Sequence, residues 1–202
     1  MDIDQLKKQF IEKYNLDSNT IFFPYGSRLY GTNKQESDYD FISIVSNNSS
    51  IPTGTEYRNG NIDIHIYKFD DFQEQLKLHK IQMLECWYQP DSIAPKHFKF
   101  KLHLPTLRDS ISEKASHSFV KAKKKIEVEK DYYIGWKSLF HSLRILNFGI
   151  QIVKFNRIDF SQINEHWFDI LQSNEYDWAY FKETYQPIYN SLASEFRLLA
   201  PK

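Results

Sequence analysis

The chain has 202 residues and no formal net charge, because 26 Lys and Arg residues balance 26 Asp and Glu residues. Proteins that coat nucleic acid usually carry a basic surplus, so this balance disfavours that class while permitting a local basic pocket. The hydrophobic fraction of 41% is typical of a folded globular protein and excludes wholesale disorder. The aromatic content of 16% is high and favours core packing, with base stacking as the alternative.

The sequence predicts a soluble, cytoplasmic protein that does not enter a membrane. Its first residues are too charged for a signal peptide, and it contains no run of about eighteen apolar residues that would span a bilayer. Its single cysteine, Cys86, allows no internal disulfide framework, which fits a reducing compartment. We expect Cys86 to be a buried, small apolar side chain.

The chain begins with patterns of helix and strand. Apolar residues at helical spacing predict a helix at residues 2–15, and the polar segment 15–19 ends it. β-Branched and aromatic residues predict a buried strand at 20–25, followed at once by Gly26. A second strand is predicted at 38–45.

A polar loop at 47–54 precedes a predicted hairpin. A strand at 55–58 leads through the turn-forming sequence Asn59-Gly60-Asn61 into a strand at 61–67. In the latter, isoleucines alternate with other residues, Asp63 among them. The isoleucine face is therefore expected to be buried, and Asp63 is expected to point to the other face.

From Asp70 onward the patterns are helical. Asp70 is the predicted N-cap of a helix at 71–79, and the segment 91–106 has no regular pattern. Further helices are predicted at 81–88, 108–129, 132–156, 162–172 and 175–199. The order of elements therefore predicts an α/β part that ends near residues 90–105 and an all-helical part after it.

Gly26 and Ser27 directly follow the predicted strand at 20–25. A glycine at this place lets the backbone turn tightly and approach a ligand with no side chain in the way. If residues 27–30 begin a short helix, its free N–H groups and its dipole favour a phosphate, and the Ser27 hydroxyl adds a donor. The pair alone is weak support, because Gly-Ser is common in ordinary turns.

Two aspartates follow on the second strand. Asp38 and Asp40 lie two positions apart, so their carboxylates are expected on one side, where like charges favour a divalent cation. Asp63, on a neighbouring strand, is expected to meet them across the sheet. Three carboxylates are what two Mg²⁺ or Mn²⁺ ions need to hold a phosphoryl group between attacking and leaving oxygens. The alternative for Asp38 and Asp40 alone is a solvated strand edge.

The combination of Gly26-Ser27, Gly31-Thr32, Ser37-Asp38-Tyr39-Asp40 and a later strand aspartate resembles the nucleotidyltransferase superfamily named after DNA polymerase β. Within that superfamily, Gly-Ser-Arg-Leu-Tyr-Gly ahead of Glu-Ser-Asp-Tyr-Asp is most similar to the predicted RNA-ligase-associated branch. The motif covers residues 26–40, and the order of strands and helices extends the likeness to about residue 75.

The resemblance implies that Gly26 and Ser27 hold the β,γ-phosphates of a nucleoside triphosphate. It implies that Asp38 and Asp40 ligate both metal ions, and that Asp63, a third ligand, helps to deprotonate the acceptor hydroxyl. The other nucleotide-binding residues predicted from this motif are Arg28, Gly31 and Ser37.

The resemblance also implies an α+β fold class. A small mixed β-sheet nucleotidyltransferase (palm-like) domain, flanked by helices, is predicted at residues 1–100. An all-α helical domain at 101–202 is predicted to complete the cleft for nucleotide and acceptor.

The predicted helix at 132–156 places three basic side chains, Lys137, His141 and Arg144, on one face. Leucines on a separate stripe are expected to pack the helix. All three are predicted to bind the nucleotide, Lys137 and Arg144 through its triphosphate, with a solvated or ion-paired helix face as the equally weighted alternative.

Two further features stay open at this point. The segment Lys121–Lys125 can bind a polyanion, although the acidic residues that follow it favour a solvated face. His65 lies beside Asp63 on the same face and has either a role in the site or a purely structural one.

The leading hypothesis is an enzyme that transfers a nucleoside monophosphate from a nucleoside triphosphate to a hydroxyl group. The acceptor is an RNA or tRNA 3′ end, a protein side chain or a small molecule, with RNA slightly favoured by the resemblance. The alternative is a non-catalytic protein that senses nucleotide or binds a partner. The presence of Asp38, Asp40 and Asp63 together ranks the enzyme first, because a degenerate module is expected to lose one of them.

Overall fold

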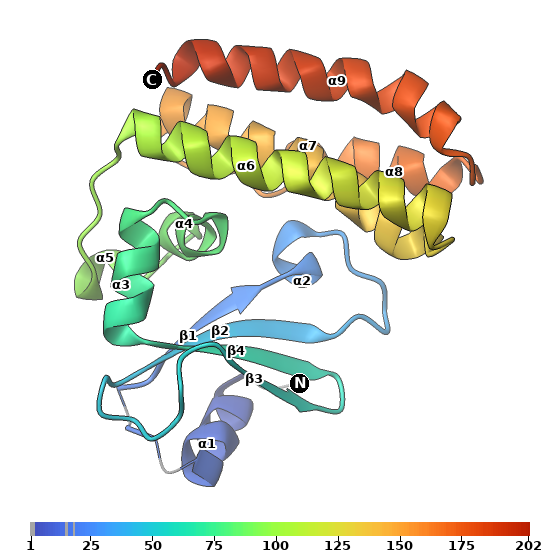
Figure 1. Ribbon diagram of the computed structural model, residues 1–202. Helices are drawn as coiled ribbons and strands as arrows, with labels where there is room; N and C mark the ends of the chain where they lie inside the picture. Colours follow the sequence, from blue (N-terminus) through green and yellow to red (C-terminus); the bar gives the residue numbers. More distant parts are fainter. Residues whose placement is uncertain (1–2, 15, 18) are drawn as a thin grey trace.

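The computed structural model describes residues 3–14, 16–17 and 19–202. A small sheet lies in the middle, with one helix against its lower face and a layer of helices above its upper face (Figure 1). Residues 2 and 15, the predicted ends of the first helix, lie outside the described residues. The chain runs through the sheet first and then builds the upper layer, so the two halves predicted from sequence are stacked on each other.

The sheet has four strands in the order β1-β2-β4-β3 within the described residues. The two central strands, β2 and β4, are parallel, and each outer strand is antiparallel to its neighbour. The bounds are Ile21–Tyr25 for β1, Tyr39–Val45 for β2, Thr55–Asn59 for β3 and Ile62–Lys68 for β4. Because β2 and β4 run in the same direction, their first residues lie at the same edge of the sheet.

The helices fall into a group around the sheet and a group above it (Figure 1). Those of the first group are α1 (Ile3–Tyr14), α2 (Ser27–Tyr30), α3 (Phe69–Lys77), α4 (Ile81–Tyr88) and α5 (Ala94–His97). Those of the second group are α6 (Leu104–Lys123), the π-helix η1 (Lys124–Val128), α7 (Tyr132–Phe155), α8 (Asn164–Gln172) and α9 (Trp178–Leu199). The long helices α6 and α7 lie side by side, joined by η1 and a short turn.

The lower face of the sheet is mostly apolar. Phe41, Ile64 and Ile66 are almost completely buried there, together with Phe10 of α1 and Phe22 of β1. The alternation of β4 thus places its isoleucines against α1, as predicted, and places Asp63 on the upper face. Burial of these side chains contributes about 1.5–3 kcal/mol each.

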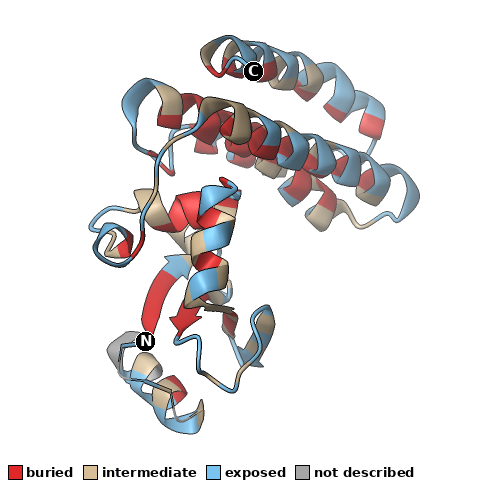
Figure 2. Ribbon diagram, turned by 60° about the vertical axis from the view of Figure 1, so that its left-hand side comes forward, coloured by how far each residue is buried: buried red, intermediate tan, exposed pale blue. Residues whose placement is uncertain are grey.

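The upper face of the sheet and the long helices share one core. Ile42 and Ile44 of β2 pack in it with Phe72 of α3, Ile111 of α6 and Leu146 of α7. Figure 2 shows that the buried residues gather on the inward sides of the helices. This shared core fixes the height of α6 and α7 above the sheet, and so positions every side chain discussed below.

Three predicted boundaries are wrong. Asp38 precedes β2, which begins at Tyr39. Asp70 is not an N-cap, because α3 begins at Phe69 directly after β4, and Asp70 lies in its first turn. The backbone N–H of Asp70 instead donates to Asn47 Oδ1 at 2.9 Å, a tertiary contact that no local pattern predicts.

The third difference concerns the segment 91–106, which was predicted to be irregular. It contains the short helix α5, and α6 begins at Leu104, one turn before the predicted start at Arg108. Pro105 is accommodated because the first turn of a helix needs no backbone N–H from that residue.

The predicted α+β class, a small mixed sheet followed by helices, is confirmed. In the part of the chain that the structure describes, no helix combines the length and the apolar character needed to cross a bilayer. The division of the chain at residues 100 and 101 stays a prediction.

Candidate functional site

A row of polar residues crosses the sheet near the first residues of β2 and β4. Asp40 of β2 pairs with Asp63 of β4, Tyr25 of β1 pairs with Asp40, and Arg58 of β3 pairs with Asp63. Directly opposite residues of neighbouring strands share a face of the sheet. Asp40 shares its face with Ile42 two positions on, so this row lies on the upper face, beneath the long helices.

Gly26 lies against the first carboxylate of this row. Its φ of 76° and ψ of −158° belong to a region that is essentially restricted to glycine. A Cβ built on Gly26 would collide with the Asp40 carboxyl group. Position 26 therefore requires glycine for two reasons: the turn from β1 into α2 and the close approach of Asp40.

Asp63 is the most buried of the three predicted carboxylates, with 7% of its surface exposed. Its Oδ2 accepts a hydrogen bond from Arg58 Nη2 at 2.5 Å. Its Oδ1 is buried and has no hydrogen-bond partner among the described residues. Burying a carboxylate oxygen without a partner costs free energy of folding unless a cation or a hydrogen-bond donor contacts that oxygen.

The carboxylates influence one another. Burial raises the pKa of the Asp40 carboxyl, and the neighbouring Asp63 and Asp38 raise it further, whereas Lys137 lowers it. Asp38 is exposed at the mouth of the site. Among the described residues, no group of three or more His, Cys, Asp or Glu side chains is arranged to hold a metal ion. The Asp63 side chain instead accepts the hydrogen bond from Arg58.

Arg28, predicted to bind nucleotide, holds the loop that precedes β2. Its guanidinium lies 3.7 Å from the centre of the Tyr39 ring. Its Nη2 donates to the carbonyl oxygen of Ser37 at 2.6 Å, and its Nε to that of Asp38 at 3.2 Å. These contacts fix the backbone that carries Asp38. Arg28 does not line either of the cavities described next.

Gly31 also has a backbone role in the structure. It ends α2 in the left-handed conformation, with a φ of 71°. Nearby, the side-chain nitrogen of Asn164 in α8 donates to the carbonyl oxygen of Tyr30 at 2.6 Å. The helical part thus anchors the end of α2 and, through it, the turn at Gly26.

Two adjoining cavities lie beside the polar row, with volumes of about 430 and 340 Å³. Both are lined by Ser27, Asp40, Tyr133 and Lys137. The smaller one continues to Ser37 and Asp38, and the larger one continues between α6 and α7. Of the predicted site residues, Gly26, Ser27, Ser37, Asp38, Asp40, Lys137, His141 and Arg144 line at least one of the two, whereas Arg28, Gly31 and Asp63 line neither.

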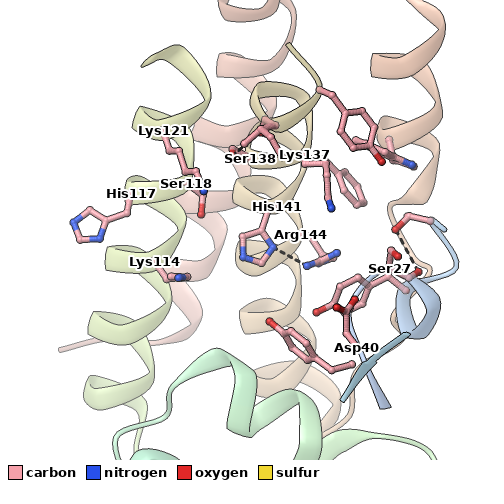
Figure 3. Close-up of a pocket in the computed structure, with 18 residues that line it drawn as sticks. Ser27, Asp40, Lys114, His117, Ser118, Lys121, Lys137, Ser138, His141 and Arg144 are labelled. Carbon is pink, nitrogen blue, oxygen red and sulfur yellow. Dashed lines mark hydrogen bonds between the residues drawn. The ribbon is translucent and has the colours of Figure 1, made fainter. Parts of the chain in front are cut away.

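The three basic residues predicted on α7 line the larger cavity (Figure 3). Arg144 is 5% exposed and lies 3.4 Å from the centre of the Tyr30 ring, so it is not on a solvated helix face. Its Nη2 donates to His141 Nδ1 at 2.6 Å, and its Nε is buried without a partner among the described residues. Burial lowers the pKa of His141 well below its ordinary value, and the positive charge of Arg144 lowers it further.

A buried carboxyl group supports this part of the site. The Tyr30 hydroxyl donates to Glu85 Oε2 at 2.7 Å, and Glu85 in α4 is fully buried. Burial raises the pKa of Glu85 to about 7, partly offset by Arg144 and by the hydrogen bond from Tyr30. Glu85 was not predicted from the sequence, although a lone carboxylate in the apolar segment 81–88 is a usable signal.

The opposite wall of the larger cavity belongs to α6 and was also missed. Lys114, His117, Ser118 and Lys121 line it, at the spacing of one helix face (Figure 3). Their helical spacing within the predicted helix at 108–129 is the sequence feature that could have identified them. Only Lys121 had been considered, as part of the segment Lys121–Lys125.

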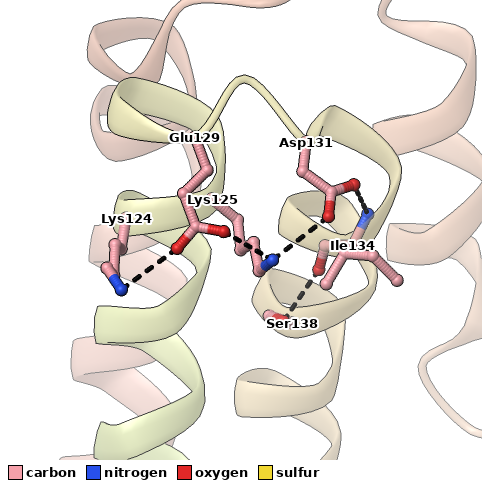
Figure 4. A network of polar contacts seen from close by, with 6 residues as sticks. All are labelled: Lys124, Lys125, Glu129, Asp131, Ile134 and Ser138. Carbon is pink, nitrogen blue, oxygen red and sulfur yellow. Dashed lines mark hydrogen bonds and ion pairs between the residues drawn. The ribbon is translucent and has the colours of Figure 1, made fainter.

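The lysines of the segment Lys121–Lys125 differ in whether they pair with acidic residues. Lys123 pairs with Glu127 at 3.6 Å, and Lys124 pairs with Glu129 at 3.1 Å. Lys125 bridges Glu129 and Asp131, at 2.6 and 3.2 Å (Figure 4). These three lysines are compensated by the acidic residues that follow them, whereas Lys121 faces the cavity.

His65, whose role was left open, lies next to Glu56, with 3.5 Å between Nδ1 and Oε1. It lines neither cavity, and its positive form would lower the pKa of Asp40.

No protein-family model matches the sequence, and no curated protein is detectably similar to it. Among solved structures, the chain is similar to a nucleotidyltransferase-like protein from Exiguobacterium sibiricum 255-15, with a TM-score of 0.33 and 12% sequence identity. That similarity covers 98% of this chain and 74% of the other. At so low a TM-score we base no conclusion about fold or function on it.

Proposed function

We propose that this protein is a metal-dependent nucleotidyltransferase, similar to the superfamily named after DNA polymerase β. It transfers a nucleoside monophosphate from a nucleoside triphosphate to a hydroxyl group and releases pyrophosphate. The RNA-ligase-associated branch remains the subgroup that its motif resembles most. The polar row and the turn beside it support the proposal.

One observation carries the proposal: Gly26 lies directly against the carboxylate of Asp40, and Asp63 lies at the same register on the parallel strand. Two carboxylates in neighbouring positions repel each other and destabilise the fold. Such an arrangement is typical of functional sites, where burial and like charges are combined for chemistry. The missing side chain of Gly26 makes room for the Asp40 carboxylate directly beside the turn into α2, so the backbone of this turn and the carboxylate border the same cavity.

The donor chemistry of the three aspartates suits a divalent metal, although the described residues are not arranged as a metal site while Asp63 is bonded to Arg58. Asp38, Asp40 and Asp63 supply only carboxylate oxygens, which Mg²⁺ and Mn²⁺ prefer, and Oδ1 of Asp63 is buried with no partner in the described structure. These three aspartates would hold the metal once Asp63 shifts from Arg58. When bound, Mg²⁺ would neutralise the phosphates and lower the pKa of the attacking hydroxyl.

The proposed reaction is an in-line displacement at the α-phosphorus. The acceptor oxygen forms a bond to the α-phosphorus while the bond to the bridging oxygen breaks, and pyrophosphate leaves with that electron pair. The acceptor proton passes to the Asp63 carboxylate and from there to water. Gly26 and Ser27 would position the β,γ-phosphates, and Lys137, which lines both cavities, would balance their charge.

Release of pyrophosphate from ATP, CTP, GTP or UTP in the presence of Mg²⁺ or Mn²⁺ tests the function. Cellular RNA, purified protein and small hydroxyl compounds serve as separate acceptor pools, and a mass increase identifies the product. The matched variants are Asp63→Asn and, as control, Asp109→Asn. Asp109 is an exposed carboxylate on α6, paired with Lys202 at 3.7 Å, far from the polar row in the sequence.

We expect pyrophosphate release by the wild-type chain and by Asp109→Asn, and a loss of about 100-fold or more in Asp63→Asn. Thermal unfolding of both variants establishes that they are folded. Equal pyrophosphate release by all three proteins, or none from any triphosphate with either metal, rejects the proposed function.

A further inference from the structure

Four permanent cations line the larger cavity, and none of them makes an ion pair within the described structure. They are Lys114 and Lys121 of α6 and Lys137 and Arg144 of α7, here called the cationic wall. Among the residues that the structure describes, Asp40 is the only carboxylate that lines this cavity. The cavity therefore has an excess of positive charge although the whole chain is neutral.

The chain provides an internal comparison for this excess. Lys123, Lys124 and Lys125 lie within a few residues of Lys121, and each of them is paired with an acidic residue. The three lysines directly after Lys121 are thus paired with acidic residues away from the cavity, whereas Lys121 lines the cavity and makes no ion pair within the described residues. A solvated stretch of lysines favours no such difference between neighbours.

The cationic wall is part of the folded interior and not only of the surface, because one of its four residues is buried. Arg144 is 5% exposed, its Nε has no partner in the described residues, and its guanidinium rests on the Tyr30 ring. A buried charge with an open donor is stabilised by an anion that reaches it. Ser118, 7% exposed, adds a hydroxyl on the α6 side.

The α6 part of the wall is separate from the carboxylates. Lys137 lowers the pKa of Asp40 most among the basic groups, His65 lowers it less, and neither lysine of α6 contributes to that effect. Lys114 and Lys121 instead act on His141, deeper between the helices. Metal ions at the carboxylates would already neutralise most of a bound triphosphate, so the cations of α6 remain for a second anion.

We infer that the α6 side of the cationic wall is a binding site for a phosphate-bearing small molecule, which is the acceptor of the proposed transfer. This inference rests on the proposed function for the identity of the ligand as acceptor. Its phosphate lies between Lys114, Lys121 and Arg144, and its free hydroxyl is directed towards Asp40. A cavity of about 430 Å³ suits a compact molecule of this kind.

The test is binding without turnover, so it can fail independently of the proposed function. Calorimetry measures the affinity of the full chain for ribose 5-phosphate, for uncharged ribose and for ATP with Mg²⁺. The variants are Lys114→Ala/Lys121→Ala and, as the matched control, Lys123→Ala/Lys124→Ala. Both double variants remove two lysines from the same helix hairpin, but only the first alters the cavity.

We expect ribose 5-phosphate to bind and ribose not to bind. The affinity for ribose 5-phosphate should fall at least about tenfold in Lys114→Ala/Lys121→Ala and stay unchanged in the control, since each charge-assisted contact contributes about this factor. The affinity for ATP should be the same in both variants, and ribose 5-phosphate should bind equally well when ATP is present.

Three outcomes overturn the inference. If ATP competes with ribose 5-phosphate and loses affinity in Lys114→Ala/Lys121→Ala, the α6 lysines hold the phosphates of the nucleotide itself. If an oligoribonucleotide binds through these lysines and ribose 5-phosphate does not, the ligand is a nucleic acid. If both double variants behave like the wild type towards ribose 5-phosphate, the wall is not the site.

Discussion

The polar row of the sheet borders the cavity of the cationic wall through Asp40, but the row and the wall hold their charges in different ways. Asp40 and Asp63 are placed by the register of two parallel strands and are at least partly buried beside each other. Lys114 and Lys121 are long side chains that extend from the exposed face of a helix. The row therefore costs stability through like-charge repulsion, whereas the two exposed lysines of α6 cost little. Chemistry and stability therefore compete mainly in the polar row.

The substitution Asp40→Asn breaks the row most directly, and we expect the largest effect from it. Pyrophosphate release should fall about 100-fold or more, because one of the proposed metal ligands is lost. The free energy of unfolding should rise by about 1 kcal/mol or less, because the repulsion with Asp63 disappears from a partly exposed group. Chemical denaturation and a turnover assay measure the two effects. A variant that is less stable than the wild type would contradict the repulsion.

Gly26→Ala tests the close approach of the backbone to the row. The new methyl group collides with the Asp40 carboxyl, and the backbone occupies a region that alanine avoids, so we expect a loss of about 3 kcal/mol or more in stability. Gly60→Ala is the control, because Gly60 also has a positive φ, 58°, but has open space around it. Its cost should be about 1 kcal/mol. Equal costs for the two variants would mean that Asp40 does not constrain Gly26.

Glu85 lies beneath the wall, and its titration should change the stability of the fold. Burial raises the pKa of Glu85 to about 7 in the folded protein, above its ordinary value of 4.5, although Arg144 and Lys114 oppose the shift. The folded state therefore binds this proton more tightly, and the stabilisation is complete below 4.5 and is lost as the pH rises through 7.

The substitution Glu85→Gln removes that dependence. Relative to the wild type, the variant should gain stability between about pH 5 and about pH 8, by an amount on the order of 3 kcal/mol. Urea denaturation across this range measures the difference. A constant difference between the two proteins at all pH values would show that Glu85 does not change its protonation state there.

The smallest effect is expected at a paired lysine beside the wall. Lys125→Ala removes the ion pairs with Glu129 and Asp131, and such solvent-screened surface pairs contribute little to stability. Its melting temperature should fall by a few degrees at most, and its affinity for ribose 5-phosphate should not change. A clear loss of affinity would mean that the paired and unpaired lysines are not functionally distinct.

Sequence patterns predicted the parts of the molecule that depend on neighbouring residues. The alternation in β4 predicted which face Asp63 occupies, and the apolar stripes predicted the long helices to within a few residues. The first turn of α3 was mispredicted because its donor is satisfied by Asn47, 23 positions away. Local propensity carries no information about such a partner.

The sequence by itself determined which face of the sheet each strand residue occupies and where the two long helices lie along the chain, because both follow from periodicity. It also determined the motif from Gly26 to Asp40, which depends on the backbone freedom of glycine. Only the tertiary structure decided which charges are compensated. Glu85 meets Tyr30 across 55 positions, and Arg144 is buried on the same ring. The distinction between a paired lysine and one left for a ligand depends on where two helices lie over a sheet, and that placement is set by the shared core.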